Sequence, residues 1–437
     1  MHWLLIGYMF LFVHRPFEVW PELGDLRIER IYMLVTLVVW SVSPGKRWLG
    51  NPLHGAFAGF ALAVLFAWVM SPWMEKTQPV VEDYFKILVF YLLLVTTVHD
   101  EKGLKRVVLG LLGVMGVYLA HSLREYTNGR HTYRMGIARM IGVDSSAGDP
   151  NSFGASIVFV LPFVVAVWRT GLGGRLMQFA LSGYTLLSIV CILLTGSRSS
   201  LLGLGVWAAF VALRGKHRWK WVAVLAVAAP LAFLVLPEEL QTRFETIVNP
   251  DAGPANAKES GEGRVQGFYI GLELWGDNPI SGIGPGAWRP ATKSQIESHN
   301  LIGQLVGELG TLGLLGFLAV LGSFYANWRA VAAVRKAYPE WQNEFPVQVA
   351  SAVGTAVLLL LFMGCFGHNL FRYSWLWYGG FLAIARRCLA VRVREWEYDC
   401  QFVEVEEPML EPGWTLHSGH EESTPYETRL GRESGSS

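Results

Sequence analysis

Apolar and polar positions follow one another in long blocks along the chain, and this pattern predicts the fold. Mainly apolar runs are separated by shorter polar connections. Runs of about 20 apolar residues have the length at which a helix crosses a bilayer. We expect about twelve such helices, near residues 1–14, 28–43, 53–71, 84–98, 104–121, 151–168, 176–195, 199–213, 219–236, 299–327, 347–366 and 372–390. The pattern predicts an all-α integral membrane protein.

The positions of Lys and Arg predict which helix ends share a side of the membrane. Alternate connections carry dense positive clusters, such as Lys46 with Arg47 and Arg214 with Arg218. Because positive connections stay in the cytoplasm, both termini are expected there. Two long connections, 122–150 and 237–298, then face outward. The first fits less well, because it contains Arg124, Arg130, Arg134 and Arg139.

The connection 237–298 is expected to be a large periplasmic loop that carries an amphipathic helix. Apolar residues recur at helical spacing between Gly263 and Trp275, which suits a helix lying on the membrane surface. After residue 394 the composition becomes acidic and then rich in Gly, Ser and Pro. We therefore predict a membrane domain over 1–394 and a disordered cytoplasmic tail over 395–437.

Composition narrows the class of protein. Hydrophobic residues make up 52% of the 437 positions and the net charge is only +1, which excludes a strongly basic nucleic-acid binder. The four Cys residues are scattered without a CxxC pair or a Cys/His metal spacing. We expect no disulfide, no metal site and no cofactor.

His299 is the candidate for proton transfer. It stands in Ser298-His299-Asn300, directly before a long apolar run, and an imidazole can accept a proton from an attacking hydroxyl. The alternative is that His299, Ser298 or Asn300 merely caps the helix, and position alone favours that alternative. Glu308 is excluded as a direct partner of His299 within one straight helix, because it lies half a turn out of phase and about 13.5 Å along the axis. We expect Glu308 to need a partner on another helix.

Glycines follow His299 along the same apolar run. They recur every three or four residues, at Gly303, Gly307, Gly310, Gly313 and Gly316. Small residues at this spacing let another helix approach closely. The stripe is interpreted as a packing surface that fixes the depth and rotation of His299.

Three arginines are candidates for anion binding. Arg198 stands in a short turn between two apolar runs, where a simple interfacial charge is an equal alternative. Arg264 opens the predicted outward helix, where the helix dipole disfavours a cation. Arg139 in the other outward connection is a weaker candidate. On the predicted topology Arg198 and Arg264 lie on the same side as His299, and two cations with one base suit a diphosphate leaving group and an acceptor hydroxyl without a metal.

Two further motifs are given structural interpretations. Asp149-Pro150-Asn151 reads as the cap and first turn of the following helix, although Asn151 also suits contact with a sugar. Gly282, Gly284 and Gly286 predict a turn. They do not form a nucleotide fingerprint, because no strand precedes them and no crossover unit follows.

Several motifs together resemble the O-antigen ligase and O-antigen polymerase superfamily. The similar segments are Ser298-His299-Asn300-Leu301 with the following Gln304, Glu308 and Gly310; Thr195-Gly196-Ser197-Arg198-Ser199; Gly263-Arg264 with Trp275 and Asn278-Pro279-Ile280; and Asp149-Pro150-Asn151. The resemblance implies a multi-helix glycosyltransferase in the bacterial inner membrane. It implies a polyprenyl-diphosphate-linked glycan donor, used at the periplasmic face with inversion and without a metal. It assigns diphosphate binding to Arg198 and Arg264 and catalysis to His299.

Alternatives stay open at this point. Within the superfamily the acceptor hydroxyl belongs to a lipid-anchored core sugar, a protein or a growing polymer, so a polymerase or a protein O-glycosylation ligase shares the motifs. A permease for lipid-linked sugars is the rival from another class. A permease often shows repeated halves and broken helices, and the sequence contains no internal repeat. A catalytically dead scaffold is disfavoured by the intact His299, Arg198 and Arg264.

Overall fold

The computed structural model describes residues 1–48, 50–134, 137–144, 149–215, 218–247, 249, 255–293 and 297–403. The chain divides into two compact units, Met1–Arg392 and Val393–Ser437. The first unit contains the candidate site, and its architecture is helical. The expected tail over 395–437 falls mainly on residues 404–437, which lie outside the described residues.

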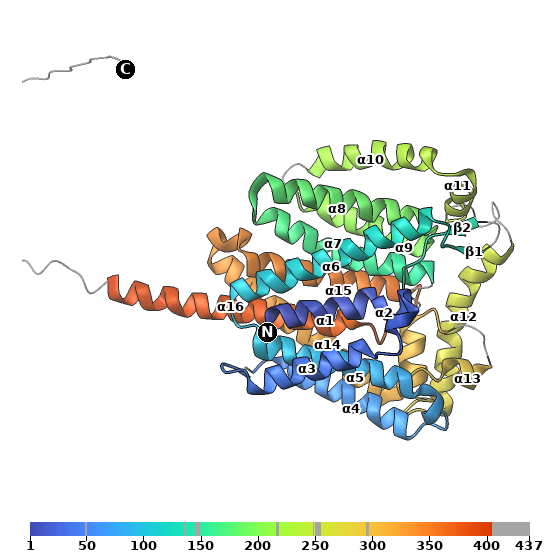
Figure 1. Cartoon of the computed structure of the whole chain (residues 1–437), viewed down its shortest axis with the longest axis horizontal. Coiled ribbons are helices and arrows are strands. Elements are labelled where there is room, and N and C mark those ends of the chain that lie inside the picture. Colours follow the sequence, from blue (N-terminus) through green and yellow to red (C-terminus); the bar gives the residue numbers. More distant parts are fainter. Residues whose placement is uncertain are drawn as a thin grey trace, which may run out of the picture. The chain divides into compact units, whose positions relative to one another are not determined.

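Helices account for nearly all regular structure in the first unit (Figure 1). The N-terminal elements are α1 (His2–His14), α2 (Pro16–Val19), η1 (Pro21–Leu23), α3 (Ile28–Val42), α4 (Pro52–Val69), α5 (Met74–Thr97), α6 (Glu101–Thr127), β1 (Thr132–Arg134) and β2 (Ile137–Arg139). The middle elements are α7 (Pro150–Arg169), α8 (Gly174–Leu194), α9 (Arg198–Leu213), α10 (Arg218–Val235), α11 (Glu238–Glu245), α12 (Ala255–Asp277) and α13 (Trp288–Thr292). The last are α14 (Leu301–Ala337), η3 (Pro339–Asn343), α15 (Phe345–Gly364) and α16 (Tyr373–Val403).

Each of the twelve expected membrane segments overlaps a helix. Six helices in the described part of the chain are long and apolar enough to cross a membrane, namely α4, α6, α7, α8, α14 and α15. Helix α9 is also apolar but shorter. The chain is therefore a mainly helical, multi-pass membrane protein, while the total of twelve crossings and the outward loop remain predictions from the sequence.

The structure departs from the expected element boundaries in several places. Helix α12 begins at Ala255, so Arg264 does not open it, and α14 continues to Ala337. The connection 122–150 contains an antiparallel hairpin of β1 and β2, with Thr132 opposite Arg139. Helix α5 begins at Met74 rather than near residue 84, so it includes a charged first half. Helix α16 continues to Val403, beyond the expected end of the last membrane segment at 390 and into the expected tail. Arg, Glu and Ala have high helix propensity in polar segments as well as in apolar ones. Hydropathy alone therefore does not locate the residue at which a helix begins or ends.

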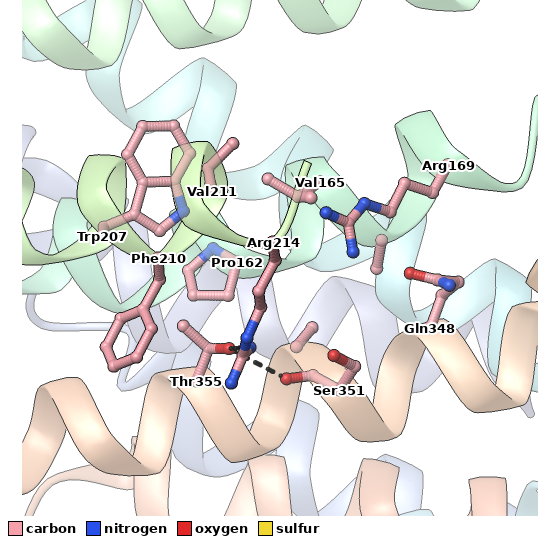
Figure 2. A pocket seen from close by; sticks show the side chains of 12 residues that line it. Pro162, Val165, Arg169, Trp207, Phe210, Val211, Arg214, Gln348, Ser351 and Thr355 are labelled. Atoms are coloured by element: carbon pink, nitrogen blue, oxygen red, sulfur yellow. Dashed lines mark hydrogen bonds between the residues drawn. The ribbon is translucent and has the colours of Figure 1, made fainter. Parts of the chain in front are cut away.

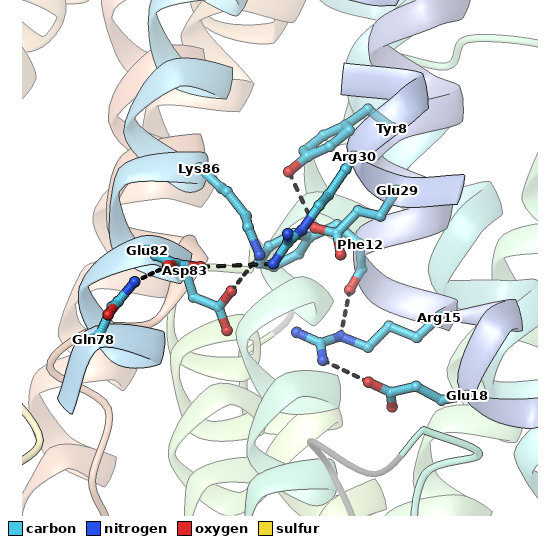
Figure 3. A network of polar contacts seen from close by, with 10 residues as sticks. All are labelled: Tyr8, Phe12, Arg15, Glu18, Glu29, Arg30, Gln78, Glu82, Asp83 and Lys86. Carbon is cyan, nitrogen blue, oxygen red and sulfur yellow. Dashed lines mark hydrogen bonds and ion pairs between the residues drawn. The ribbon is translucent and has the colours of Figure 1, made fainter. Parts of the chain in front are cut away.

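Charged residues at the start of α5 pair with one another and with α3 (Figure 3). Lys86 pairs with Asp83 at 2.7 Å, and the Arg30 guanidinium lies 3.8 Å from the Glu82 carboxylate. The α3 partner Arg30 is largely exposed, as expected for a pair at a helix end. These ion pairs give partners to charged residues in the first half of α5, a part of the helix that the apolar pattern does not predict.

The core of the unit forms where apolar faces of α4, α6, α7, α14, α15 and α16 meet. Helix α14 packs along α4 and α12, and α15 packs along α7. Phe57, Phe163 and Trp377 are among the fully or almost fully buried side chains there. A Cβ atom on Gly316 would lie 3.1 Å from the Phe60 Cα, so the glycine allows α14 to approach α4. The core thereby fixes α14, whose first residue follows the candidate site.

Helix α14 is interrupted at Gly310, which has φ 59° and ψ −156°. The amides of Thr311 and Leu312 donate to the carbonyls of Pro279 and Ile280, at 2.8 and 3.2 Å. In return, the Gly307 and Glu308 carbonyls accept from the amides of residues 283 and 284, both at 2.9 Å. The segment 279–284 thus replaces the helical hydrogen bonds that the break removes. The expectation of one continuous helix over 299–327 is wrong at this residue.

The Gly-rich segment 282–286 has the backbone that this insertion requires. Gly282, Gly284 and Gly286 have φ values of 64°, 108° and 70°, a region that favours glycine. The predicted turn is therefore confirmed. The turn segment and the glycine-rich part of α14 around Gly310 supply backbone hydrogen-bond partners to each other. This pairing explains why the sequence contains both glycine-rich motifs.

Candidate functional site

Asn300, rather than His299, caps α14. The Asn300 side-chain oxygen accepts hydrogen bonds from the amides of Ile302 and Gly303, both at 3.0 Å. His299 precedes the cap and its side chain is half-buried. The capping alternative is thus confirmed for Asn300, and the His299 side chain does not make the cap.

A second histidine, His368, lies beside His299. Their ring centroids are 5.6 Å apart and the rings are tilted by 35°. His368 belongs to the connection between α15 and α16, which is anchored by the Asn369 side chain donating to the Leu360 carbonyl at 2.7 Å. Burial, followed by the charges of His299 and Arg372, lowers the pKa of His368 to about 4. His368 is therefore neutral near pH 7.

Sequence reasoning missed His368, although one signal was present. The triplet His368-Asn369-Leu370 repeats the residue types of His299-Asn300-Leu301. In both copies the Asn side chain bonds to helix backbone, at the start of α14 and near the end of α15. The repeated triplet places an imidazole next to a helix terminus twice, and the fold brings the two rings together.

Arg198 is the first residue of α9 and follows a tight turn. Gly196 has φ 56°, and the Ser197 hydroxyl caps the helix by accepting from the Ser200 amide at 3.3 Å. The Arg198 guanidinium donates to the Thr246 hydroxyl at 3.1 Å. The predicted short turn is confirmed, since α8 ends at Leu194. The turn holds a guanidinium at the N-terminal end of the apolar helix α9.

Arg264 on α12 lies close to the same end. Its guanidinium carbon is 5.7 Å from the centroid of the Phe366 ring, which belongs to the connection that carries His368. Burial, followed by the positive charge of Arg198, lowers the pKa of Arg264. The fold therefore brings together two of the cations that sequence reasoning selected.

Glycine contacts fix Arg264 relative to His299. A Cβ atom on Gly303 of α14 would overlap the carbonyl oxygen of Gly267 of α12, so the two backbones touch there. A Cβ atom on Gly267 would lie 3.4 Å from the Ser298 hydroxyl and 3.7 Å from the His299 amide. The packing role of Gly303 is thus confirmed. Val265 of α12 is 60% exposed, and the placement of this helix on a membrane surface stays a prediction from the sequence.

Arg139 is 1% exposed and binds the turn that precedes Arg198. Its guanidinium donates to the Thr195 carbonyl at 2.7 Å and to the Asn151 side chain at 3.1 Å. Asp149 caps α7 by accepting from the Ser152 amide at 2.9 Å, as predicted. These contacts give Arg139 and Asn151 a structural role in joining β2, α7 and the turn of Arg198.

Glu308 is fully buried and finds a partner other than the one expected. Its carboxylate accepts from the Gly286 amide at 2.8 Å, within the inserted glycine-rich segment. The Gln304 amide lies 3.4 Å away. The expected partner on another helix is thus replaced by loop backbone. Glu308 holds the segment that closes the break at Gly310.

Positive ends of helices also meet near the two arginines. The first turns of α7 and α9 touch, since a Cβ atom on Gly154 would overlap the Ser200 side chain. Helix α14 also begins here, at Leu301. Helix N-termini carry partial positive charge, and with Arg198 and Arg264 they favour an anion. In the described part of the chain, no group of three or more His, Cys, Asp or Glu side chains is arranged for metal binding.

Comparison with protein families identifies the region that contains these residues. Residues 183–318 match the family model described as O-antigen ligase. The matched region runs from α8 into α14 and includes Arg198, Arg264 and His299. It supports membership of the superfamily that the motifs predicted, and that prediction is confirmed. A search of curated proteins finds no match.

Proposed function

We propose that this member of the O-antigen ligase superfamily transfers a glycan from a polyprenyl-diphosphate carrier to an acceptor hydroxyl. The reaction takes place at the periplasmic face of the bacterial inner membrane. The observation that supports this proposal most is the grouping of Arg198, Arg264 and His299 at one end of the helices. The charge of Arg198 acts on Arg264, and Gly267 on the helix of Arg264 packs against Ser298 and His299. Two cations and a base are the groups that displacement of a diphosphate by a hydroxyl requires.

The arginines bind the diphosphate and stabilise the charge that develops on it. A guanidinium offers a planar fork of donors that matches phosphate oxygens. As the bond between the anomeric carbon and the diphosphate oxygen breaks, its electron pair stays with the diphosphate. The adjacent N-terminal ends of α7, α9 and α14 add favourable partial charge. Protein groups thus supply the stabilisation without a metal.

His299 accepts the proton of the acceptor hydroxyl while that oxygen attacks the anomeric carbon. Attack opposite the departing diphosphate inverts the configuration at that carbon. His368 is a positioning residue in this proposal. Its lowered pKa keeps it neutral, so it packs against the His299 ring without competing as a second charge.

The acceptor separates three related activities. A lipid-anchored core sugar defines a ligase, a growing chain defines a polymerase, and a protein hydroxyl defines an O-glycosylation enzyme. Among these, the ligase is the proposal, because the matched family model is described as O-antigen ligase.

A permease for lipid-linked sugars is the second candidate function. The break at Gly310 favours it, because broken helices are frequent in transporters. The backbone at that break is nevertheless paired with residues 279–284, which favours a fixed structure over a moving gate. The pair of imidazoles beside the arginines also favours an enzyme over a permease.

Reconstitution in proteoliposomes tests the proposal. Purified protein is given a polyprenyl-diphosphate glycan and, separately, a core-sugar lipid, a peptide acceptor or the glycan alone, and products are identified by mass spectrometry. The expected product is the glycosylated core lipid with release of polyprenyl diphosphate. Movement of the donor across the bilayer without any transfer would instead establish the permease.

The periplasmic orientation needs a separate test. A Lys293→Cys substitution places one thiol at an exposed residue after α13, in a background with the native cysteines replaced. A membrane-impermeant maleimide should label it in intact spheroplasts. Labelling only after lysis would overturn the proposed face.

A further inference from the structure

Three arginines gather at the end of the helices opposite His299. Arg169 lies in the last turn of α7, Arg214 forms the C-cap of α9, and Arg335 lies in the last turn of α14. Arg198 begins α9, so Arg214 lies about 24 Å away along that helix. Arg335 is likewise at the far end of α14 from His299. This second group of cations is therefore separate from the proposed catalytic site.

The three arginines line one cleft of about 1080 Å³ between α7, α9, α14 and α15. Among the described residues that line it there is no Asp or Glu. Figure 2 shows Arg169 and Arg214 in an adjoining recess with Gln348 and Thr355. The Arg214 guanidinium donates to the Thr355 hydroxyl at 3.1 Å, which fixes its position at the edge of the cleft.

The cations repel one another in the absence of an anion. Burial, followed by the charges of Arg169 and Arg335, lowers the pKa of Arg214. Each arginine alone is explained by its place at a helix C-terminus, where a cation is favoured, and by its place in a positive connection. Neither explanation accounts for three cations that share a cleft without a carboxylate.

The remaining wall of the cleft is apolar and open. Tyr325 on α14 is 59% exposed and Leu358 on α15 is 47% exposed, and Leu361 continues the same wall. Both helices are long and apolar enough to cross a membrane. A positive group at the ends of two membrane helices, continuous with an exposed apolar groove, matches a molecule with a phosphate head and hydrocarbon tails.

We propose that this cleft binds an anionic phospholipid. The phosphate contacts Arg169, Arg214 and Arg335, and the acyl chains lie against Tyr325, Leu358 and Leu361. Basic recesses between membrane helices bind the head groups of such lipids, and the volume accommodates a head group with the first part of its chains. The site does not depend on the proposed glycan transfer.

Lipid retention by the full-length protein tests the proposal. The protein is exchanged into nanodiscs or detergent with phosphatidylglycerol, phosphatidylcholine or inorganic phosphate, and bound molecules are counted by native mass spectrometry. Phosphatidylglycerol should remain bound at concentrations at which phosphatidylcholine does not. The combined substitution Arg169→Gln, Arg214→Gln and Arg335→Gln should weaken its binding by at least about tenfold.

A control variant on α14 and a photolabelling measurement complete the lipid-binding test. Lys336→Gln removes a charge from an exposed residue of the same region of α14 that does not line the cleft, and it should retain wild-type binding. If the triple variant does not fold, Arg335→Gln alone at an exposed position should still weaken binding measurably. A phosphatidylglycerol with a photoreactive acyl chain should label residues 321–328 and 351–361.

The other outcomes overturn the proposal. Equal retention of both phospholipids would show an unselective apolar groove. Full competition by millimolar inorganic phosphate would show a site for free phosphate. Unchanged binding in a folded triple variant would show that the arginines do not hold the lipid.

Discussion

The two ends of α9 place the same residue type in opposite surroundings. Arg198 begins the helix, where the dipole disfavours a cation, whereas Arg214 caps its C-terminus, where the dipole favours one. The helix itself therefore stabilises Arg214. Arg198 is held instead by its turn and by the Thr246 hydroxyl. An anion beside Arg198 is stabilised by both the guanidinium and the helix N-terminus, whereas an anion beside Arg214 is stabilised by the guanidinium alone.

The neighbours of these arginines differ as well. At the first end, His299 and His368 stand in contact, and one of them can accept a proton. At the second end, the described lining of the cleft contains no His, Asp or Glu, so those residues bind an anion without a group for proton transfer. The proposed functions of the two clusters therefore differ because only the first one has a base beside its arginines.

The largest effect is expected from His299→Ala. Loss of the general base should lower glycan transfer by roughly 10²- to 10⁴-fold while the protein stays folded in the membrane. Transfer is measured in proteoliposomes together with the thermal midpoint. His131→Ala, at an exposed histidine of the hairpin connection, should keep wild-type turnover. Near-normal turnover in His299→Ala would show that His299 is not the general base, and the arginine cluster beside it would then lack the group that distinguishes it from the cluster at the other end of α9.

Arg264→Lys should lower transfer by roughly tenfold or more, because an ammonium does not reproduce the fork that binds two phosphate oxygens. The matched change Arg175→Lys lies at an exposed residue near the start of α8, outside both sites, and it should change transfer little. Turnover of both variants is measured at saturating donor. Near-normal turnover of Arg264→Lys would mean that Arg264 contributes through its charge alone rather than through the fork.

Gly310→Ala should destabilise the protein by about 2–4 kcal/mol, because alanine at positive φ is strained. Its Cβ would also lie 2.5 Å from the Ile280 carbonyl oxygen. Displacement of segment 279–284 should reduce transfer too. Gly322→Ala on the same helix meets no atom within 4 Å and should be neutral or slightly stabilising. Thermal unfolding distinguishes them, and a stable Gly310→Ala would show that the break is dispensable.

The smallest effect concerns His368 and pH. Its folded pKa of about 4 lies below the ordinary 6.5, so the unfolded chain binds the proton more readily between these values. Stability should therefore fall as pH drops from about 6.5 toward 4. His368→Gln should flatten this part of the pH profile of the thermal midpoint, and His131→Gln should not. Identical profiles for wild type and His368→Gln would contradict the assignment.

The sequence predicted the local elements of the site because each rests on neighbouring residues. The cap at Asp149, the tight turn before Arg198 and the glycine turn at 282–286 are set by backbone preferences within a few positions. The apolar runs likewise predicted a helix at every expected membrane segment, since burial in lipid depends on composition along one helix. Family membership also followed from such short motifs.

Contacts between segments that are distant in sequence could be identified only from the tertiary structure. His368 lies 69 positions from His299, and only the packing of α15 against its neighbours brings the rings to 5.6 Å. The break at Gly310 depends on amides and carbonyls of residues 279–284 that pair across the helix, and Glu308 depends on the Gly286 amide. Periodicity along one helix carries no information about such partners. Local sequence thus predicted the caps and turns at the starts of α7 and α9, whereas the contacts between helix ends came from the tertiary structure, because long-range packing selects among many arrangements that local preferences allow equally.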